Sequence, residues 1–299
     1  MSFSYNTKVE LCKTQQVGKC CAIAECYGML LFCNTFSSRE IKIITGNPSL
    51  GQRLRERFSD VFSLEFDILP ETGQTGKQSY IINSPEKLSN VVETYGFSLD
   101  NLIAHHVNLG VLEDDCCCRS FMRGAFLTGG AITNPAKSYH LEIVTDHYSV
   151  SRETYSLLLD MGFSPKEAIR GGNYVIYFKQ SSAIEDFLTM IGAPIHAMEL
   201  MSAKIEKDMR NSVNRKVNCD TANVSKTVDA AIFHINAIRK IRTAGGFEAL
   251  PEKLRQTALL RLQNPELSIK ELADMSAPPV TKSCISHRLR KLVELSSIR

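Results

Sequence analysis

The sequence predicts a duplicated α+β domain followed by an all-α domain that ends in a helix-turn-helix. Two observations concern the order of elements. A pattern in the first two-thirds of the 299 residues recurs after 96 residues, and the last 33 residues carry two helical patterns separated by prolines. The third observation is a change in the sign of the charge near residue 203.

The internal repeat predicts two halves, 1–112 and 113–195. Its matching pairs are Cys20-Cys21 with Cys116-Cys117, Gly28 with Gly124, Gly96 with Gly192, and Ser79–Ile82 (SYII) with Asn173–Ile176 (NYVI). Each half predicts a helix, two strands, a helix, two strands and a final helix, at about 18–33, 35–45, 48–58, 62–83 and 84–95, and at 115–129, 130–146, 149–161, 163–180 and 181–191. Hairpin loops are expected at Glu71–Gly76 and Gly171–Asn173.

The first helix of each half carries a common motif. Cys26–Asn34 (CYGMLLFCN) aligns with Met122–Gly130 (MRGAFLTGG), and small residues within the motifs would let the two helices approach closely. With the αββαββ order, this motif resembles that of the LAGLIDADG homing endonucleases. The resemblance implies that an acid next to last in each motif holds the catalytic metal. Those positions are Cys33 and Gly129, which offer no hard oxygen ligand, so we expect neither metal nor catalysis.

Helices are predicted for the rest of the chain. A linker helix is expected over 196–219, and Asp220–Asn223 offers N-caps for a further helix through about Ile241 that opens a domain over 220–299. One side of that helix is apolar and is expected in the core: Val228, Ala231, Ile232, Ile235 and Ile238. Gly245-Gly246 is expected to end it, and another helix is predicted from Pro251 to about Gln263.

The C-terminal pattern is typical of a helix-turn-helix. A short helix with one apolar side (Ile269, Leu272, Ala273 and Met275) is followed by Pro278-Pro279, which forces a break, and Thr281 then caps a second helix. Its apolar stripe is Ile285, Leu289 and Leu292. The opposite face is polar and basic, as on a helix that enters the DNA major groove. We predict base contacts from Lys282, Ser283, Ser286 and His287, and phosphate contacts from Arg288, Arg290 and Lys291. The alternative is a solvated basic face on a packing module.

Charge and composition narrow the class of protein. Residues 1–203 hold 17 Lys and Arg against 22 Asp and Glu, net −5, whereas residues 204–299 hold 18 against 10, net +8. This split favours a basic nucleic-acid module on an acidic body. No run approaches a membrane span, no signal pattern opens the chain and no phosphate-binding loop occurs, so we expect a cytoplasmic, nucleoid-associated protein without cofactor or small-molecule substrate. The ten cysteines lack the paired spacing of a metal site and are interpreted as small buried side chains.

Two further sets of residues in the N-terminal domain are candidates for a binding site. Arg39, Lys42, Lys137, Arg170 and Lys179 fall on strands or loops of the sheet that grips DNA in homing endonucleases. They predict either a second DNA contact or a platform for a protein partner. His105-His106 and Glu113–Asp115 suggest a metal site only weakly, because adjacent histidines cannot face one site in a helix. Asp114 or Asp115 serves better as an N-cap.

Two segments make a family resemblance specific. They are Asn214–Ala231 (NRKVNCDTANVSKTVDAA) and Pro278–Leu292 (PPVTKSCISHRLRKL). With the degenerate LAGLIDADG duplication, the chain resembles the WhiA family of bacterial regulators. The resemblance implies a non-enzymatic protein that binds double-stranded DNA and regulates transcription, in sporulation or in cell division and chromosome segregation. The alternatives are an active homing endonuclease or RNA-maturase descendant, and a protein-interaction scaffold.

Overall fold

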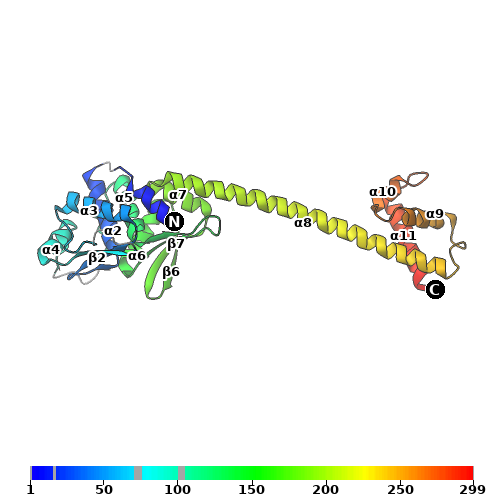
Figure 1. Ribbon diagram of the computed structural model, residues 1–299, viewed down its shortest axis with the longest axis horizontal. Helices are drawn as coiled ribbons and strands as arrows, with labels where there is room; N and C mark the ends of the chain where they lie inside the picture. The colour runs from blue at the N-terminus through cyan, green and yellow to red at the C-terminus, as the bar shows by residue number, and fades with distance from the viewer. Residues whose placement is uncertain (1, 16–17, 71–75, 100–104, 299) are drawn as a thin grey trace. The chain divides into compact units, whose positions relative to one another are not determined.

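The computed structural model describes residues 2–15, 18–70, 76–99 and 105–298. It divides into two compact units, Met1–Lys207 and Asp208–Arg299, whose elements are labelled in Figure 1. Within the described segments, no helix is both long and apolar enough to cross a membrane.

The first unit is α+β and contains the predicted repeat. The elements of its first half are α1 (Phe3–Cys12), α2 (Lys19–Leu31), β1 (Thr35–Phe36), β2 (Ile41–Thr45), α3 (Pro48–Phe62), β3 (Gln78–Ile82) and α4 (Pro85–Thr94). The short 3₁₀ helix η2 (Leu109–Val111) leads into the second half, which consists of α5 (Asp115–Gly129), β4 (Gly130–Ile132), β5 (Leu141–Thr145), α6 (Tyr148–Asp160), β6 (Lys166–Arg170), β7 (Asn173–Phe178) and α7 (Ser181–Ile191). The predicted α+β fold with its duplicated order is confirmed, and α1 precedes it unpredicted.

Both sheets are antiparallel, and the pairing of β2 with β3 in the first corresponds to the pairing of β5 with β7 in the second. Their strand orders are β1-β2-β3 and β4-β5-β7-β6. Ile41 pairs with Ile82 in the first sheet, as Leu141 pairs with Phe178 in the second. The predicted hairpin at Gly171–Asn173 joins β6 to β7, with positive φ at Gly171 and Gly172, the conformation that glycine adopts at no steric cost. The other predicted hairpin loop, Glu71–Gly76, lies largely outside the described residues.

The prediction of two regular strands over 62–83 is wrong for the described residues. Only β3 forms there, and Ile68 joins it through an isolated bridge to Ile81. The backbone N–H groups of Asp67 and Ile68 both donate to the Ile81 carbonyl, so two residues face one as in a β-bulge, which interrupts the ladder. The Asp67 carboxylate then accepts from the backbone N–H groups of Asn83 and Ser84, just before α4.

The core of the first unit is built around the contact between α2 and α5, which we call the seam. Figure 1 labels both helices in the interior of this unit. The seam is tight because glycine lies on each side of it. A Cβ on Gly28 would be 2.1 Å from the Phe121 carbonyl oxygen, and one on Gly124 would be 2.0 Å from that of Glu25. Tyr27 is fully buried beside the seam and stacks on Tyr95 with ring centroids 4.3 Å apart.

The segment after α7 is a single helix, α8 (Pro194–Thr243). The predicted helix start at Asp220–Asn223 is therefore wrong. Pro194 fixes the beginning of α8, and no glycine or proline follows before Gly245, whose φ of 71° ends the helix as expected. Without a break, the capping residues lie inside the helix, where the Asn223 side-chain amide donates to the Cys219 sulfur one turn back at 3.7 Å.

The second unit has its own apolar core. Besides the C-terminal part of α8, it contains α9 (Glu252–Gln263), α10 (Ile269–Asp274) and α11 (Lys282–Ile298). The core joins residues of all four helices: Ile238, Ile241, Leu254, Ala258, Leu272, Ala273, Ile285, Leu289 and Leu292. Only part of the apolar stripe that was predicted as core on α8 is buried. Ala231 and Ile238 are buried, but Val228 and Ile232 are 45% and 52% exposed, because the described residues that could cover them pack only near the end of α8.

Candidate nucleic-acid interface

Helix α10 is held at its start by a reciprocal capping box. The Ser268 side chain accepts from the Glu271 backbone N–H, and the Glu271 carboxylate accepts from that of Ser268 at 2.7 Å. Hydrogen bonding to the Glu271 carboxylate, from the Ser268 backbone N–H first and from the Ser268 side chain second, lowers the pKa of Glu271. Leu272 and Ala273 are buried as predicted, whereas Met275 is 54% exposed, because it lies at the C-cap where the chain leaves the helix. The cap therefore fixes where the first helix of the motif begins.

The turn between α10 and α11 follows the prediction. The chain leaves α10 before Pro278-Pro279 and returns toward it, where the Val280 N–H donates to the Ala273 carbonyl at 3.1 Å. The Thr281 hydroxyl then accepts from the Cys284 N–H at 3.3 Å, which confirms Thr281 as the cap of α11. Proline break and cap together orient α11 against α10.

Helix α11 separates its apolar and polar faces completely. Ile285, Leu289 and Leu292 are each at most 1% exposed, and burying an aliphatic side chain of this size stabilises a fold by about 1.5–3 kcal/mol. All but one of the polar residues predicted to meet DNA are exposed. The exposed ones are Lys282, Ser283, Ser286, His287, Arg290 and Lys291. A cationic surface therefore covers the side of α11 opposite the core.

The exception is Arg288, which is half-buried. Its Nη1 donates to the Thr257 hydroxyl on α9 at 3.4 Å. Arg290, by contrast, has a side chain 70% exposed, with only a loose approach of 3.9 Å to Glu294 one turn away. The Arg288 guanidinium thus links α11 to α9, while Arg290 is free to approach a phosphate. The contacts of both with DNA remain predictions.

Arg261 on α9 is a buried residue that supports the helix-turn-helix, and the sequence pattern did not predict this role. The residue is 1% exposed, and its Nη1 donates to the Leu267 carbonyl at 2.6 Å, just before α10. Burial lowers the pKa of Arg261. The pKa of His234 on α8 is also lowered, by burial first and by the charge of Arg261 second. A buried arginine in an amphipathic pattern looks like an ordinary surface residue in the sequence, so no local signal could have revealed it.

The five basic residues predicted as a second DNA contact lie on strands of the two sheets or in the segments next to them. Arg39 lies in the β1–β2 turn and Lys42 on β2, whereas Lys137 lies in the β4–β5 turn. On the second sheet, Arg170 Nη1 donates to the Glu142 carboxylate at 3.1 Å, and Lys179 Nζ lies 5.4 Å from the centre of the Tyr177 ring. The charge of Arg170 is therefore compensated within the sheet, which weakens its part in a cationic surface.

The two lost metal-acid positions cannot bind a hard cation. The Cys33 thiol donates to the Thr35 carbonyl at 3.0 Å, and burial raises its pKa to about 12. At Gly129 there is no room for any side chain, because a Cβ would lie 2.5 Å from the Val144 carbonyl oxygen and 3.0 Å from the Phe32 Cβ. Neither position supplies the carboxylate that metal-dependent phosphodiester cleavage uses in this fold.

A buried carboxylate does occur at the seam, but it is paired with arginines. Glu25 on α2 is fully buried and receives two hydrogen bonds from Arg53, at 2.5 and 2.8 Å, and one from Arg123 at 3.2 Å. Arg123 also donates to the Ile191 carbonyl at 2.6 Å. This charge network joins α2, α3, α5 and the end of α7. The sequence did not reveal it, because its members lie 28 and 98 residues apart.

The adjacent histidines have separate partners. His105 Nε2 lies 2.7 Å from the Phe36 carbonyl, and its ring centroid is 4.2 Å from that of His147. Burial, and then the nearby His147, lower the pKa of His105 to about 4. His106 instead pairs with Glu153. In the acidic run, Asp114 lies at the N-cap position of α5, but its side chain makes no capping hydrogen bond, so the predicted capping role is not seen.

Fold and site together define a class of protein: a LAGLIDADG-like unit without acids at its motif positions, joined to a C-terminal helix-turn-helix. Comparison with known proteins identifies the class. The WhiA LAGLIDADG-like domain matches residues 118–210, and the WhiA C-terminal HTH domain matches residues 213–296. The chain belongs to the WhiA family.

Similar proteins span the full chain. A relative from Ruminiclostridium cellulolyticum is 38% identical and one from Alkaliphilus oremlandii 36% identical; both alignments cover 99% of this chain and 97% of the relative. Each carries the name "Probable cell division protein WhiA". Among solved structures, full-length DUF199/WhiA from Thermatoga maritima matches with a TM-score of 0.59 and 26% identity, over 99% of this chain and 98% of that one. The predicted family and its two-part fold are confirmed.

Proposed function

We propose that the protein is a sequence-specific DNA-binding regulator of transcription without nuclease activity. The observation that carries the proposal is the geometry of α11, whose buried stripe fixes the helix on α9 and α10 while its cationic side faces solvent. A recognition helix needs this combination, since rigid packing sets the register and exposed polar side chains meet the groove. The net charge of +8 over residues 204–299 supplies long-range attraction to phosphate.

Within α11, the proposal assigns two roles. Lys282, Ser283, Ser286 and His287 lie in the N-terminal half of the helix, the part that reads base edges in this motif. Arg290 and Lys291 contact phosphates, and Arg288 contributes mainly by holding α11 against Thr257. The WhiA relatives are named cell division proteins. The genes that this protein regulates would serve cell division, chromosome segregation or sporulation, and the protein would act on the nucleoid.

The assignment of base contacts can be tested by selecting bound duplexes from a random pool with the full-length chain. We expect one recovered sequence motif with the wild-type protein and a relaxed motif with Lys282→Ala/His287→Ala. Chromatin crosslinking of the native protein should recover the same motif at promoters. Recovery of an unchanged motif by the double variant would remove α11 from base recognition.

The seam supports the proposed absence of nuclease activity. Positions 33 and 129 lack carboxylates, and the buried Glu25 is committed to Arg53 and Arg123. We expect no nicking of supercoiled or linear duplex with Mg²⁺ or Mn²⁺ above a metal-free control. Metal-dependent nicking that co-purifies with the protein would favour the alternative of an active homing-endonuclease or maturase descendant.

For the first unit we propose a role in contacting a protein partner rather than DNA. The charge of Arg170 is compensated by Glu142, and residues 1–203 carry a net charge of −5, which suits a protein partner better than DNA. Replacing Arg39, Lys42, Lys137 and Lys179 together by Ala should leave the affinity for a duplex nearly unchanged. A loss of affinity larger than that of Arg290→Ala/Lys291→Ala would place the main DNA contact on this unit.

A further inference from the structure

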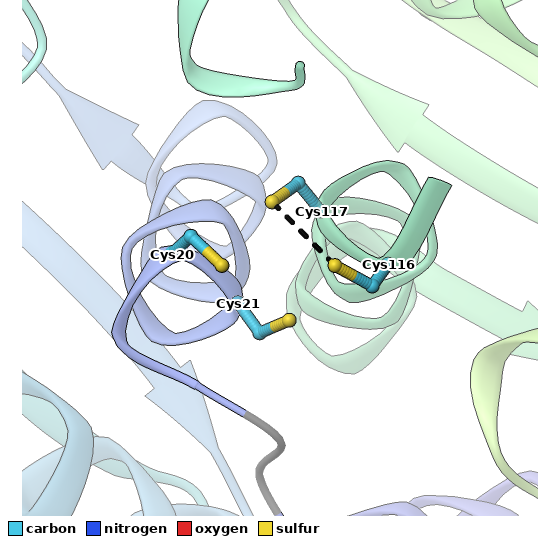
Figure 2. Close-up of side chains that lie close together, drawn as sticks. All are labelled: Cys20, Cys21, Cys116 and Cys117. Atoms are coloured by element: carbon cyan, nitrogen blue, oxygen red, sulfur yellow. Dashed lines mark hydrogen bonds between the residues drawn. The ribbon is translucent and has the colours of Figure 1, made fainter. Parts of the chain in front are cut away.

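Four cysteines from the two halves of the repeat meet at one end of the seam. They are Cys20 and Cys21 in the first turn of α2, and Cys116 and Cys117 in the first turn of α5. All four Sγ atoms lie within 4.8 Å of one another, and those of Cys116 and Cys117 are 4.0 Å apart. Figure 2 shows the four thiols pointing into the space between the two helices. We call this group the cysteine tetrad.

The spacing of the cysteines along the sequence does not predict the tetrad. Neighbouring residues of one helix point about 100° apart, so a Cys-Cys pair alone cannot enclose an ion. Here the second pair comes from the equivalent turn 96 residues later, and the glycine contacts at Gly28 and Gly124 bring the two helices close enough for both pairs to converge. The expectation that all ten cysteines are small buried side chains is therefore wrong: Cys20 and Cys219 are exposed.

The donor set suits one soft divalent ion. A tetrahedral zinc with bonds of about 2.3 Å to four thiolates places the sulfurs about 3.8 Å apart, and the tetrad already lies within 4.8 Å. No carboxylate or imidazole belongs to the group, so the site would select zinc over Mg²⁺ or Ca²⁺, which prefer oxygen.

The surroundings act on the four thiols in opposite directions. Both pairs lie in the first turns of helices, where unpaired backbone N–H groups and the positive ends of two helix dipoles stabilise negative charge. Burial raises the pKa of Cys21 and of Cys117, so a bound divalent ion has to replace their protons. Lys19, which is exposed, precedes the first pair, and Asp114 and Asp115 precede the second. Cys21 and Cys117 are buried, whereas Cys20 is exposed and Cys116 half-buried, so an ion can reach the tetrad from solvent and then be enclosed.

We propose that Cys20, Cys21, Cys116 and Cys117 bind a single zinc ion that fastens the N-terminal ends of α2 and α5 to each other. Binding replaces four S–H protons by four Zn–S bonds and releases the protons to solvent. The complex then carries a net charge of −2 on the four thiolates and the ion. Because the two pairs come from different halves, the ion crosslinks the duplicated unit, as structural zinc does in small domains.

The site can be tested with the full-length chain purified without chelator under anaerobic conditions. We expect about one zinc per chain by elemental analysis and, after replacement by Co²⁺, the intense ligand-field and charge-transfer bands of tetrahedral thiolate coordination. Cys20→Ser and Cys117→Ser should lose the metal and these bands, and the matched control Cys219→Ser should keep both. Cys219 is exposed on α8 and does not belong to the tetrad.

A second measurement does not depend on the variants folding. Zinc added to metal-free wild-type protein should raise the melting temperature of the first unit, with release of protons to a weakly buffered solution. Absence of both metal and a thermal shift would overturn the proposal. A disulfide between a cysteine of α2 and one of α5 in protein purified under anaerobic conditions, with no metal bound after reduction, would also overturn it.

Discussion

Gly28 and Gly124 lie against each other's helix across the seam, 96 residues apart in the chain. A Cβ on either would come within 2.1 Å of a carbonyl oxygen of the opposite helix. The backbone of one half therefore packs directly on the backbone of the other. This contact fixes the distance at which the paired motifs, the charge network of Glu25 and the cysteine tetrad can form.

Gly124→Ala should separate α2 from α5. We expect the free energy of unfolding of the first unit to fall by about 1–3 kcal/mol, because an inserted methyl group overpacks the seam. All nine tyrosines lie in this unit and the chain has no tryptophan, so urea titration monitored by tyrosine fluorescence reports this unit alone. Gly46→Ala is the control, since its Cβ would meet nothing closer than 3.4 Å. Equal stability of the two variants would argue against the close approach.

Glu25→Gln should destabilise the same unit more strongly. The substitution leaves the guanidinium groups of Arg53 and Arg123 buried without their common counter-charge. Breaking one side of a buried ion pair costs about 3–5 kcal/mol. As a control, Glu56→Gln removes the charge of an exposed carboxylate on α3, the helix that carries Arg53, where it accepts a hydrogen bond from Gln52, and should change the stability by about 0.5 kcal/mol or less. The same urea titration compares them, and a change below 1 kcal/mol for Glu25→Gln would contradict the network's role.

His105 should make the first unit less stable in acid. In the unfolded chain its pKa is near the ordinary 6.5, whereas burial first and His147 second lower the folded value to about 4. Between these pH values the unfolded state binds more protons, so stability is lost as the pH falls from 6.5 toward 4. We expect His105→Gln to flatten this part of a stability profile measured by tyrosine fluorescence, while His287→Gln in the second unit does not. Parallel profiles for wild type and His105→Gln would refute the assignment.

Arg290→Ala/Lys291→Ala should weaken DNA binding equally for all duplexes. Each lost phosphate contact lowers the slope of log affinity against log salt by about 0.9, so the double variant should lose about 1.8. Fluorescence anisotropy with a labelled duplex at several salt concentrations measures the slope. Lys13→Ala, an exposed cation at the end of α1, should leave it unchanged. An unaltered slope in the double variant would place both residues outside the interface.

Local patterns predicted much of this fold. The seam helix α5 and the last helix α7 begin and end where the periodicity indicated, and the proline break and the Thr281 cap delimit α11 as expected. These features depend on neighbouring residues and on backbone preferences, which a sequence displays directly. Helix α1 was missed because its buried side chains, Phe3, Thr7 and Leu11, form a single row that includes a polar residue.

What the sequence could not show depends on long-range contact. The Glu25 network and the cysteine tetrad draw their members from helices that meet only in the folded unit. The helix start expected at Asp220 was wrong for the opposite reason, since a good local capping signal is overridden when no residue breaks the helix around it. Which residues touch is decided by packing, and packing is what the linear pattern leaves out.

The crowding at Gly129 limits which single substitutions this position can accept. A mutation that placed an aspartate there would drive its Cβ into the Val144 carbonyl oxygen and the Phe32 side chain. The neighbouring strand and helix end would have to move apart before an acidic side chain could fit. One codon change alone would therefore not create a metal-binding carboxylate at this end of the seam.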